Sequence, residues 1–233
     1  MNIGFFMQQK SLGLVIPMYN EALGAEVVIK GILLETQKIA TVKIVVVDNG
    51  STDGTGKILQ QLQQTLDFHL LSLDTNQGYG GGILDGMKHI QDCDIVGWMW
   101  GDNQIDPQIV PILYEAICEG YPIAKTVRTE RHDGFFREAQ SKFYARILAS
   151  MGVFLEDLHG CPKLFQRSVW EKLQCENRDW FLDANAMITA LEHGYDIYQV
   201  DVTMKARRHG TSKVNIKTSL EFVKNLASWY WQR

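Results

Sequence analysis

Four polar clusters in this sequence carry the side chains that could bind a ligand and act on it. They read PMYNEA at residues 17–22, DNGSTDGT at 48–55, NQGYGGG at 76–82 and GDNQ at 101–104. Each follows a short apolar run and precedes a stretch with helical periodicity. Because ligands of open parallel sheets bind beyond the carboxyl ends of the strands, the clusters predict one site at a single sheet edge.

Asp48 is the last residue of the apolar run KIVVVD, before the positions that would cap the next helix. Ser51, Thr52 or Asp53 can fill the capping role, so DNGSTDGT is in part an ordinary turn at a strand end. The carboxylate of Asp48 stands outside that role. It is therefore predicted to accept hydrogen bonds from a ligand such as a nucleobase imide or ribose hydroxyls.

Asp102 and Gln104 could together hold a divalent cation. Carboxylate and amide oxygens suit Mg²⁺ and Mn²⁺, and residues i and i+2 face the same side of an extended segment. The other ligands would come mostly from a diphosphate, whose developing charge the ion would neutralise as a Lewis acid. A lone aspartate in a loop is more often a turn former or helix cap, but its place after the fourth apolar run favours ligand binding.

The glycine segment NQGYGGG does not match the known phosphate-binding loops. Ile83 and Asp85 stand where G-x-G-x-x-G would need its third glycine, and the first strand–helix turn, where a dinucleotide fold has its glycines, reads PMYNEA. Chemistry on NAD or in a P-loop is therefore not expected. The glycines are expected to let the backbone pass close to a ligand or to the adjacent strand, and a flexible turn is the alternative.

The elements that must position these clusters alternate between strand and helix. Apolar runs at residues 12–19, 43–48, 68–73 and 94–100 are continuous, which is typical of strands covered on both faces. The sequence therefore predicts an α/β fold with a mostly parallel central sheet and helices on both faces. Further on, we expect a helix at 134–150, a short apolar stretch at 163–166, a helix at 180–193 and a half-exposed strand at 196–204.

The composition indicates one domain without a membrane span or a nucleic-acid partner. The chain has 233 residues, 45% of them hydrophobic, and a formal net charge of -4, whereas proteins that bind nucleic-acid phosphates usually carry a basic excess. The four cysteines lack the spacing of a zinc site or redox pair and are expected to be reduced thiols. Neither a signal peptide nor a run of about 18 apolar residues is found, so we expect a cytoplasmic protein.

Taken in order, these motifs resemble those of glycosyltransferase family 2, the inverting enzymes of the GT-A fold, and within it the branch of dolichol-phosphate-mannose-synthase-like and polyprenyl-phosphate glycosyltransferases. VIPMYNEA resembles V-P-x-Y-N-E, VVVDNGSTDGT resembles V-D-D-G-S-x-D-G-T, NQGYGGG resembles N-x-G-x-G, WGDNQIDP resembles D-x-D-x-Q-x-x-P, and MKARRHGTSKVN resembles R-x-x-G-x-S-K. The match implies a single GT-A (Rossmann-like) domain over residues 1–233, with a nucleotide-binding half at about 12–120, an acceptor-binding half at about 121–214 and a C-terminal helix at 215–233.

The resemblance also implies a nucleotide-diphosphate-sugar donor, Mg²⁺ or Mn²⁺ as cofactor, and the residues that bind them. The metal would be bound by Asp102 and Gln104, and Arg207 with Ser212 would close over the phosphates. The residues implied for donor binding are Pro17, Tyr19, Glu21, Asp48, Gly101, Asp102 and Lys213. Without the resemblance, residues 205–213 read equally well as a solvated basic face.

Two positions depart from the family pattern. Trp100 replaces the first acid of the metal motif, and Asn49 replaces the second acid of V-D-D. The first departure leaves a thin protein shell around the metal. Either the diphosphate supplies most of the coordination, which variants of the family with Gly-Asp-x-Gln favour, or the metal dependence is weakened.

The nature of the acceptor decides which further residues take part. A sugar hydroxyl needs a carboxylate base, whereas a phosphate is mostly ionised at neutral pH and needs cations to hold it. The segment KTVRTERHDGFFREAQSKFY resembles the acceptor side of the lipid-phosphate branch and would supply Arg128, Arg131, Arg137 and Ser141, with an ordinary charged helix face as the alternative. For a hydroxyl, the candidate bases are Asp157 and Asp183; Asp183 lies near the general base of sugar-transferring relatives, but could equally be a helix-start acid.

The predicted function is an inverting, metal-assisted sugar transfer to a polyprenyl phosphate or another membrane-associated acceptor, with Asp102, Asp183 and Arg207 as the catalytic candidates. Transfer to a saccharide hydroxyl in surface-polysaccharide assembly and a non-catalytic nucleotide-sugar-binding module are the alternatives. Trp229, Tyr230 and Trp231 near the C-terminus suit peripheral contact with the inner face of a membrane. A helix that docks on the domain, or pairs with another copy of the chain, explains these aromatic residues equally well.

Overall fold

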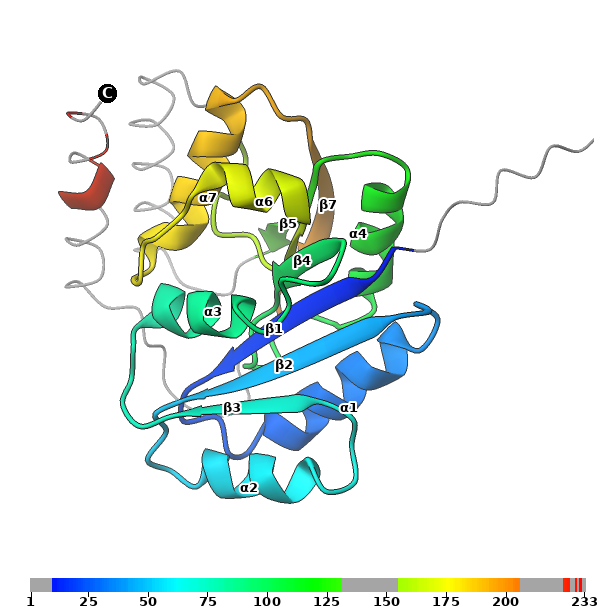
Figure 1. The fold of residues 1–233 in the computed structure, drawn as a ribbon, viewed down its shortest axis with the longest axis vertical. Helices are drawn as coiled ribbons and strands as arrows, with labels where there is room; N and C mark the ends of the chain where they lie inside the picture. Colours follow the sequence, from blue (N-terminus) through cyan, green and yellow to red (C-terminus); the bar gives the residue numbers. More distant parts are fainter. Residues whose placement is uncertain (1–9, 131–154, 206–223, 227–228, 230, 232–233) are drawn as a thin grey trace, which may run out of the picture.

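The computed structural model describes residues 10–130, 155–205, 224–226, 229 and 231. Within them a seven-stranded sheet has the strand order β3-β2-β1-β4-β6-β5-β7 (Figure 1). The strands are β1 (Leu12–Met18), β2 (Val42–Asn49), β3 (His69–Leu73), β4 (Ile95–Trp98), β5 (Ile123–Glu130), β6 (Lys163–Gln166) and β7 (Ile197–Thr203). The helices are α1 (Ala25–Thr36), α2 (Thr55–Leu62), α3 (Tyr79–Met87), α4 (Ile109–Cys118), α6 (Arg167–Leu173) and α7 (Phe181–Glu192).

Strand direction brings the ends of most strands to one edge of the sheet. β1 pairs in parallel with β2 and β4, and β2 pairs in parallel with β3. β6 runs the other way, and its first residue, Lys163, lies opposite Trp98 at the end of β4. β5 is antiparallel to β6 and parallel to β7. The chain entering β6 therefore lies at the same edge as the chain leaving β1, β2, β4 and β5.

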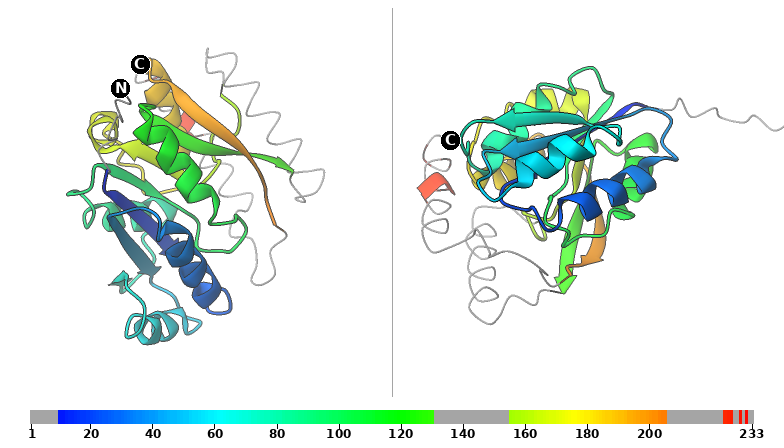
Figure 2. Two further views of the ribbon diagram at one scale, coloured as in Figure 1. Left: turned by 90° about the vertical axis from the view of Figure 1, so that its right-hand side faces the viewer. Right: turned by 90° about the horizontal axis from the view of Figure 1, so that it is seen from below.

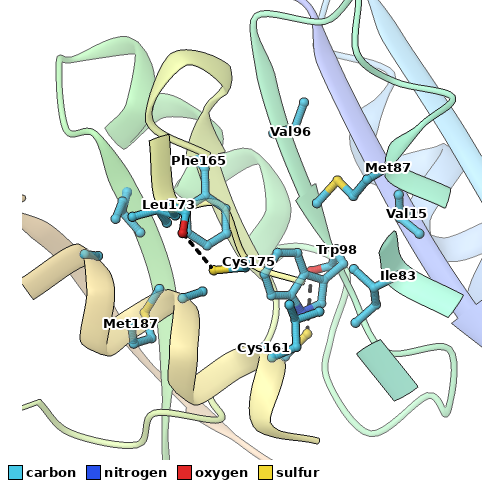
Figure 3. Close-up of a cluster of buried hydrophobic side chains, with 14 of the residues drawn as sticks. Val15, Ile83, Met87, Val96, Trp98, Cys161, Phe165, Leu173, Cys175 and Met187 are labelled. Atoms are coloured by element: carbon cyan, nitrogen blue, oxygen red, sulfur yellow. Dashed lines mark hydrogen bonds between the residues drawn. The ribbon is translucent and has the colours of Figure 1, made fainter. Parts of the chain in front are cut away.

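Helices cover both faces of the sheet, as the views in Figures 1 and 2 show. On one face, α3, α6 and α7 pack over a cluster that includes Trp98, Phe165 and Met187 (Figure 3). On the other face, α1, α2 and α4 enclose a second cluster around Ile16 and Leu113. β1, β2 and β4 are almost wholly buried between these layers, which explains their continuous hydrophobicity. The predicted α/β fold with a mostly parallel sheet is confirmed.

Two elements differ from the expectations drawn from sequence. β5 was not expected because Lys125, Thr126 and Arg128 make it polar, yet Lys125 and Thr126 have no exposed surface. α6 was not expected because it starts directly after β6, with no turn residues between the two elements. The expected half-exposed strand is confirmed as β7, whose residues alternate between partly buried and exposed after its first two residues. The helix expected at 134–150 lies outside the described residues.

The described part of the C-terminal segment contacts the rest of the domain. Leu226 is buried in the cluster that contains α7 residues, and the Asn225 side-chain amide donates to Asp179 Oδ2 at 2.5 Å. Trp231, in contrast, is 83% exposed. These contacts support docking of the segment on the domain, while Tyr230 lies outside the described residues. No helix in the described part of the chain is long and apolar enough to cross a bilayer.

Candidate active site

The loops that follow β1 and β2 are joined to each other by hydrogen bonds. The backbone amide of Asn20 donates to the Ser51 hydroxyl at 3.0 Å, and that of Glu21 donates to Thr55 Oγ1 at 2.9 Å. In return, the Thr52 amide donates to Asn20 Oδ1 at 2.8 Å. Asn20 has a φ of 56°, a left-handed conformation that asparagine tolerates. The two predicted donor loops therefore form one preformed wall, on which Pro17, Tyr19 and Glu21 are partly buried.

Asp48 supports this wall from inside. It is 7% exposed at the end of β2, and its Oδ1 accepts a hydrogen bond from the Ser51 amide at 3.0 Å. A Cβ on Gly56 would collide with Oδ2, so the carboxylate also packs closely on the first turn of α2. One carboxylate oxygen thus accepts a hydrogen bond from the turn itself, and the bonds that Asp48 would accept from a ligand remain a prediction.

Asn49 fastens the glycine segment to the end of β2. Its Nδ2 donates to the Gly78 carbonyl at 2.8 Å, while its Oδ1 accepts from the Gln77 amide at 2.9 Å. An aspartate could accept the second bond but could not donate the first, because an ionised carboxylate has no proton to give. The departure from the V-D-D pattern therefore has a structural reason in this chain.

The glycines of NQGYGGG allow backbone to approach backbone. Gly78 has a φ of 81°, and a Cβ on Gly80 would lie 2.8 Å from the Asp179 carbonyl oxygen. The Gly81 amide donates to the Arg178 carbonyl at 2.9 Å. Gly78, Gly80 and Gly81 thus approach the segment before α7, which was not expected, whereas Gly82 packs on Asn49 at the end of β2.

The GDNQ segment forms a turn and is not extended. Asn103 has a φ of 60°, and the Gln104 amide donates back to Asp102 Oδ1 at 3.1 Å. Gln104 also donates from Nε2 to the Lys205 carbonyl at 3.1 Å and accepts the Lys205 amide at 2.8 Å. Asp102 and Gln104 therefore do not face one side in the way that residues i and i+2 of a strand do. The turn lies against the chain leaving β7.

The residues of this turn fit a divalent cation only with help from a ligand. In the described ranges no three His, Cys, Asp or Glu side chains come together as a metal site. Gln104 uses its amide nitrogen for Lys205, which leaves its oxygen as a second hard donor beside the Asp102 carboxylate. Mg²⁺ commonly binds through one or two protein oxygens plus substrate phosphates and water. Asp102 and Gln104 suit that form of site, in which the ion would neutralise charge on a diphosphate.

Gly101 brings this turn against the donor wall. A Cβ at Gly101 would meet Met18 Cγ at 2.6 Å and the Pro17 carbonyl oxygen at 2.9 Å. Only glycine permits this close approach. The predicted donor residues from the loops after β1, β2 and β4 are therefore neighbours at one edge of the sheet.

Trp100, which stands in place of an acid, links the donor wall to the acceptor half. Its indole Nε1 donates to the Tyr79 hydroxyl at 2.8 Å, and the Arg128 guanidinium lies over its ring, 5.1 Å from the centroid. Tyr79 in turn stacks on Trp180, with ring centroids 4.2 Å apart. This position therefore carries an aromatic support for a cation where the family pattern has a metal-binding carboxylate.

Arg128 is held in a two-pronged ion pair by Asp157. Its Nε and Nη2 donate to the two carboxylate oxygens at 2.7 and 2.6 Å, and its backbone amide adds a third bond at 3.0 Å. The side chains are only 11% and 5% exposed, so this geometry is fixed before any ligand arrives. The other predicted acceptor residues, Arg131, Arg137 and Ser141, and the predicted phosphate-closing residues, Arg207, Ser212 and Lys213, lie outside the described residues.

Asp183 lies in the first turn of α7 and has no exposed surface. Its Oδ1 accepts hydrogen bonds from Lys163 Nζ at 2.8 Å and from the Trp98 indole at 3.2 Å. Burial raises the pKa of the Asp183 carboxyl, but Lys163 and His159 together lower it by more, so the net pKa is lowered and the group stays ionised. The candidate base is therefore part of a buried ion pair.

Lys125 is a second fully buried lysine, opposite Lys163 in the β5–β6 register. Its amine donates to the carbonyls of Thr126, Glu156 and Asp157 at 3.1, 2.8 and 3.0 Å. Burial, followed by repulsion from Lys163, lowers the pKa of Lys125 to about 7. Lys125 thus fastens the turn that carries Asp157.

Sequence reasoning missed the contributions of Lys125, Lys163 and Tyr79 to this edge. The available signal was a lysine inside an apolar stretch, in PIAKTV and GCPKLF, since lysine is almost never fully buried without partners. Tyr79 gave no such signal among the glycines.

The sheet order, the joined loops and the turn with Asp102 and Gln104 define the class as a GT-A glycosyltransferase fold. The structure is similar to that of glucosyl-3-phosphoglycerate synthase from Mycobacterium tuberculosis, with a TM-score of 0.74 and 21% identity. The match covers 94% of this chain and 79% of that chain. A second structure of that synthase, with Mn²⁺, UDP and glucosyl-3-phosphoglycerate, matches with a TM-score of 0.74 at 20% identity, with the same coverage of both chains.

Residues 14–174 match the family model described as glycosyl transferase family 2, and the chain belongs to this family. Among curated proteins it is similar to undecaprenyl-phosphate 4-deoxy-4-formamido-L-arabinose transferases. The protein from Pectobacterium atrosepticum is 30% identical over 210 residues, which cover 88% of this chain and 62% of the relative. The protein from Photorhabdus laumondii is 27% identical over 227 residues, which cover 95% and 68%. The chain thus spans about two thirds of the length of these relatives.

Proposed function

We propose that this chain transfers a sugar, with inversion, from a nucleotide-diphosphate-sugar to a polyprenyl phosphate, aided by Mg²⁺ or Mn²⁺. The observation that carries the proposal is the position of the Asp102 turn, which packs on Pro17 and Met18 through Gly101 and adjoins Trp100 under Arg128. Curated relatives named as undecaprenyl-phosphate sugar transferases support the acceptor. A synthase of the same fold crystallised with Mn²⁺ and UDP supports the donor and the ion.

Each part of the edge has a task in this proposal. The wall formed by the loops after β1 and β2 binds the nucleoside, and Asp102 with Gln104 holds the ion. When bound, the ion neutralises charge on the departing diphosphate. Arg128 receives the acceptor phosphate together with Arg131, Arg137 and Ser141, while Arg207, Ser212 and Lys213 close over the donor. Because this acceptor lies at a membrane surface, the proposal implies peripheral contact with the inner face.

The second candidate function is transfer to a saccharide hydroxyl with Asp183 as base. The ionised state of Asp183, held by Lys163, favours it. The Asp183→Asn variant separates the two candidates: loss of chemistry with intact donor binding supports a hydroxyl acceptor, and a near-normal rate supports a phosphate.

Calorimetric titration with UDP, GDP, CDP and dTDP, each with and without Mn²⁺, tests donor binding and identifies the base. Transfer of radiolabelled sugar to undecaprenyl phosphate in detergent micelles then tests catalysis. We expect Asp102→Ala to abolish transfer and the Mn²⁺-dependent part of nucleotide affinity. Asp106→Ala is the matched control, since Asp106 lies four residues further on and bonds to Lys205 and to the Gln108 amide. Full transfer by Asp102→Ala would contradict the proposal, and nucleotide binding without transfer would favour a non-catalytic module.

A further inference from the structure

The glycine segment at residues 76–82 is packed against a short segment from the second half of the chain, residues 177–179. This segment runs into α7, which lies next to α3 on one face of the sheet (Figure 1). The Arg178 carbonyl accepts the Gly81 amide at 2.9 Å, and a Cβ on Gly78 would collide with the same carbonyl oxygen. Backbone packed this closely has no slack. A displacement of residues 177–179 therefore moves the glycine segment as well.

The glycine segment is bonded in turn to the end of β2, where the nucleoside is proposed to bind. Asn49 donates to the Gly78 carbonyl and accepts the Gln77 amide. Asp48, the residue before Asn49, accepts a hydrogen bond from the turn that follows β2. Direct contacts therefore connect residues 177–179 with the wall formed by the loops after β1 and β2.

A second series of contacts leads from the same segment to the Asp102 turn. Trp180 directly follows residues 177–179, and its ring stacks on Tyr79 with the centroids 4.2 Å apart. The Tyr79 hydroxyl accepts the indole N–H of Trp100 at 2.8 Å. Trp100 stands two residues before Asp102. The position of residues 177–179 therefore bears on both the nucleoside wall and the predicted metal ligand.

Asp179 is bonded on two sides, to α7 and to the C-terminal segment at residues 224–226. Its Oδ1 accepts the Phe181 amide at the start of α7 at 2.8 Å, and its Oδ2 accepts Asn225 Nδ2 at 2.5 Å. Leu226, the residue after Asn225, is 3% exposed in the cluster that contains α7 residues. The buried leucine thus anchors the amide that bonds to Asp179.

We propose that Asp179 is a positioning residue for the donor site and that Asn225 of the C-terminal segment keeps it in place. Docking of the C-terminal segment and binding of the nucleotide-diphosphate-sugar then favour each other, because a coupling between two sites is reciprocal. The inference rests on the proposed function and adds a means of control to it. Both residues act through residues 177–179 and Trp180, and not by touching the donor.

The first test reverses the charge pattern of the Asn225–Asp179 bond. In Asn225→Asp two carboxylates face each other where the 2.5 Å bond was. We expect the affinity of the full chain for the nucleoside diphosphate that titration selects, measured by calorimetry with Mn²⁺, to fall about 5- to 10-fold. Adding Asp179→Asn supplies a new amide donor opposite the new carboxylate, so the double variant should recover most of the affinity. At saturating donor the rate of transfer should approach that of the wild type, since the bound donor restores the arrangement.

Lys224→Asn is the matched control. Lys224 is the exposed neighbour of Asn225, and this substitution changes the net charge by the same amount, so it should leave the nucleotide affinity unchanged. Equal affinity in the wild type and Asn225→Asp would overturn the inference, and so would a double variant as weak as Asn225→Asp. Absence of nucleotide binding by the wild type would instead count against the proposed function, and the next test would still decide the inference.

The second test needs no nucleotide. Hydrogen exchange followed by mass spectrometry reads the Gln77 and Gly81 amides, which are bonded within the glycine segment's contacts. In the ligand-free chain we expect residues 76–82 to exchange faster in Asn225→Asp than in Lys224→Asn, and to return toward the wild-type rate in the double variant. Equal exchange in the two single variants would overturn the inference, whether or not the chain binds a nucleotide.

A third measurement uses only the wild-type chain, so a folding defect in a variant does not affect it. Because the coupling is reciprocal, saturating nucleoside diphosphate with Mn²⁺ should slow hydrogen exchange at residues 224–226. Unchanged exchange at these residues in the nucleotide-bound chain would overturn the inference and leave the proposed function intact.

Discussion

The two sides of the ligand-binding edge are held together by different forces. The donor side, formed by the loops at residues 19–24, 49–55 and 76–82, relies on hydrogen bonds to backbone groups, such as those of Asn20, Asn49 and the Asp48 carboxylate. The acceptor-side cluster, formed by Lys125, Arg128, Asp157, His159, Lys163 and Asp183, relies on buried ions. The donor side is thus held mainly by hydrogen bonds to backbone, and the acceptor side by buried ion pairs.

This difference matters for what each side can do. Hydrogen bonds to backbone groups fix loop positions without a buried ion pair, which suits the proposed nucleoside-binding surface. Buried ions create a field that persists when water is excluded, which suits the handling of phosphates and protons. The difference also predicts that substitutions on the acceptor side will be the more costly, since removing one partner leaves an unpaired buried charge.

The largest effect is expected from Lys163→Met, which removes the ammonium that pairs with the buried Asp183 carboxylate. We expect the free energy of unfolding to fall by about 3–5 kcal/mol, measured by urea denaturation. The double variant Lys163→Met with Asp183→Leu should recover much of this loss, because no unpaired charge remains. Lys88→Met is the matched control: Lys88 pairs with Asp85 but is 66% exposed, so its loss should cost no more than about 1 kcal/mol. Equal losses in both single variants would contradict the comparison.

A smaller effect is expected on the donor side from Asn49→Asp, which restores the acid of the family pattern. The aspartate keeps the acceptor for Gln77 but faces the Gly78 carbonyl without a proton to donate. We expect a loss of about 1–3 kcal/mol in the free energy of unfolding. Asn103→Asp is the control, because Asn103 has a φ of 60° that aspartate also tolerates. A stable Asn49→Asp variant would mean that the glycine segment is held by its contact with residues 177–179 alone.

The same contrast separates what the sequence could predict from what it could not. β1, β2 and β4 and the donor loops were predictable because continuous apolar runs and turn residues are local signals. On the acceptor side the sequence named Arg128, Asp157 and Asp183 as candidates, but not how they pair. The pairing was not predictable, because Lys125, Lys163 and Asp183 come from β5, β6 and α7 and meet only through tertiary contacts. Asp102 was named by its place after a strand, and its role remains a prediction. The turn at Asn103, which makes the segment non-extended, bonds to Lys205, about 100 residues away along the chain.

Lys125→Met should change the pH dependence of stability. In the folded chain the pKa of Lys125 is about 7, below its usual value of 10.5. Between these values the unfolded state binds more protons, so this residue makes stability rise with pH; below pH 7 the cost of the buried ammonium is fully present. The free energy of unfolding of the wild type, minus that of Lys125→Met, should therefore rise by about 1 kcal/mol between pH 7 and 8, measured by urea denaturation. Lys172→Met, at an exposed lysine in α6, should show no such rise.

The smallest effect is expected where the two sides meet, at Lys205. Its Nζ pairs with Asp106 at 2.8 Å, but the two side chains are 53% and 45% exposed, so Lys205→Ala should cost less than about 1 kcal/mol. The bonds that hold the Asp102 turn use the backbone of Lys205 and survive this change. Mn²⁺-dependent nucleotide affinity, measured by calorimetry, should therefore stay within about twofold, a difference of about 0.4 kcal/mol. Lys205→Pro removes the amide that donates to Gln104, and it should weaken that affinity clearly. If Lys205→Ala weakened it as much as Lys205→Pro, charge would act on the donor side as well, and the division between the two sides would fail.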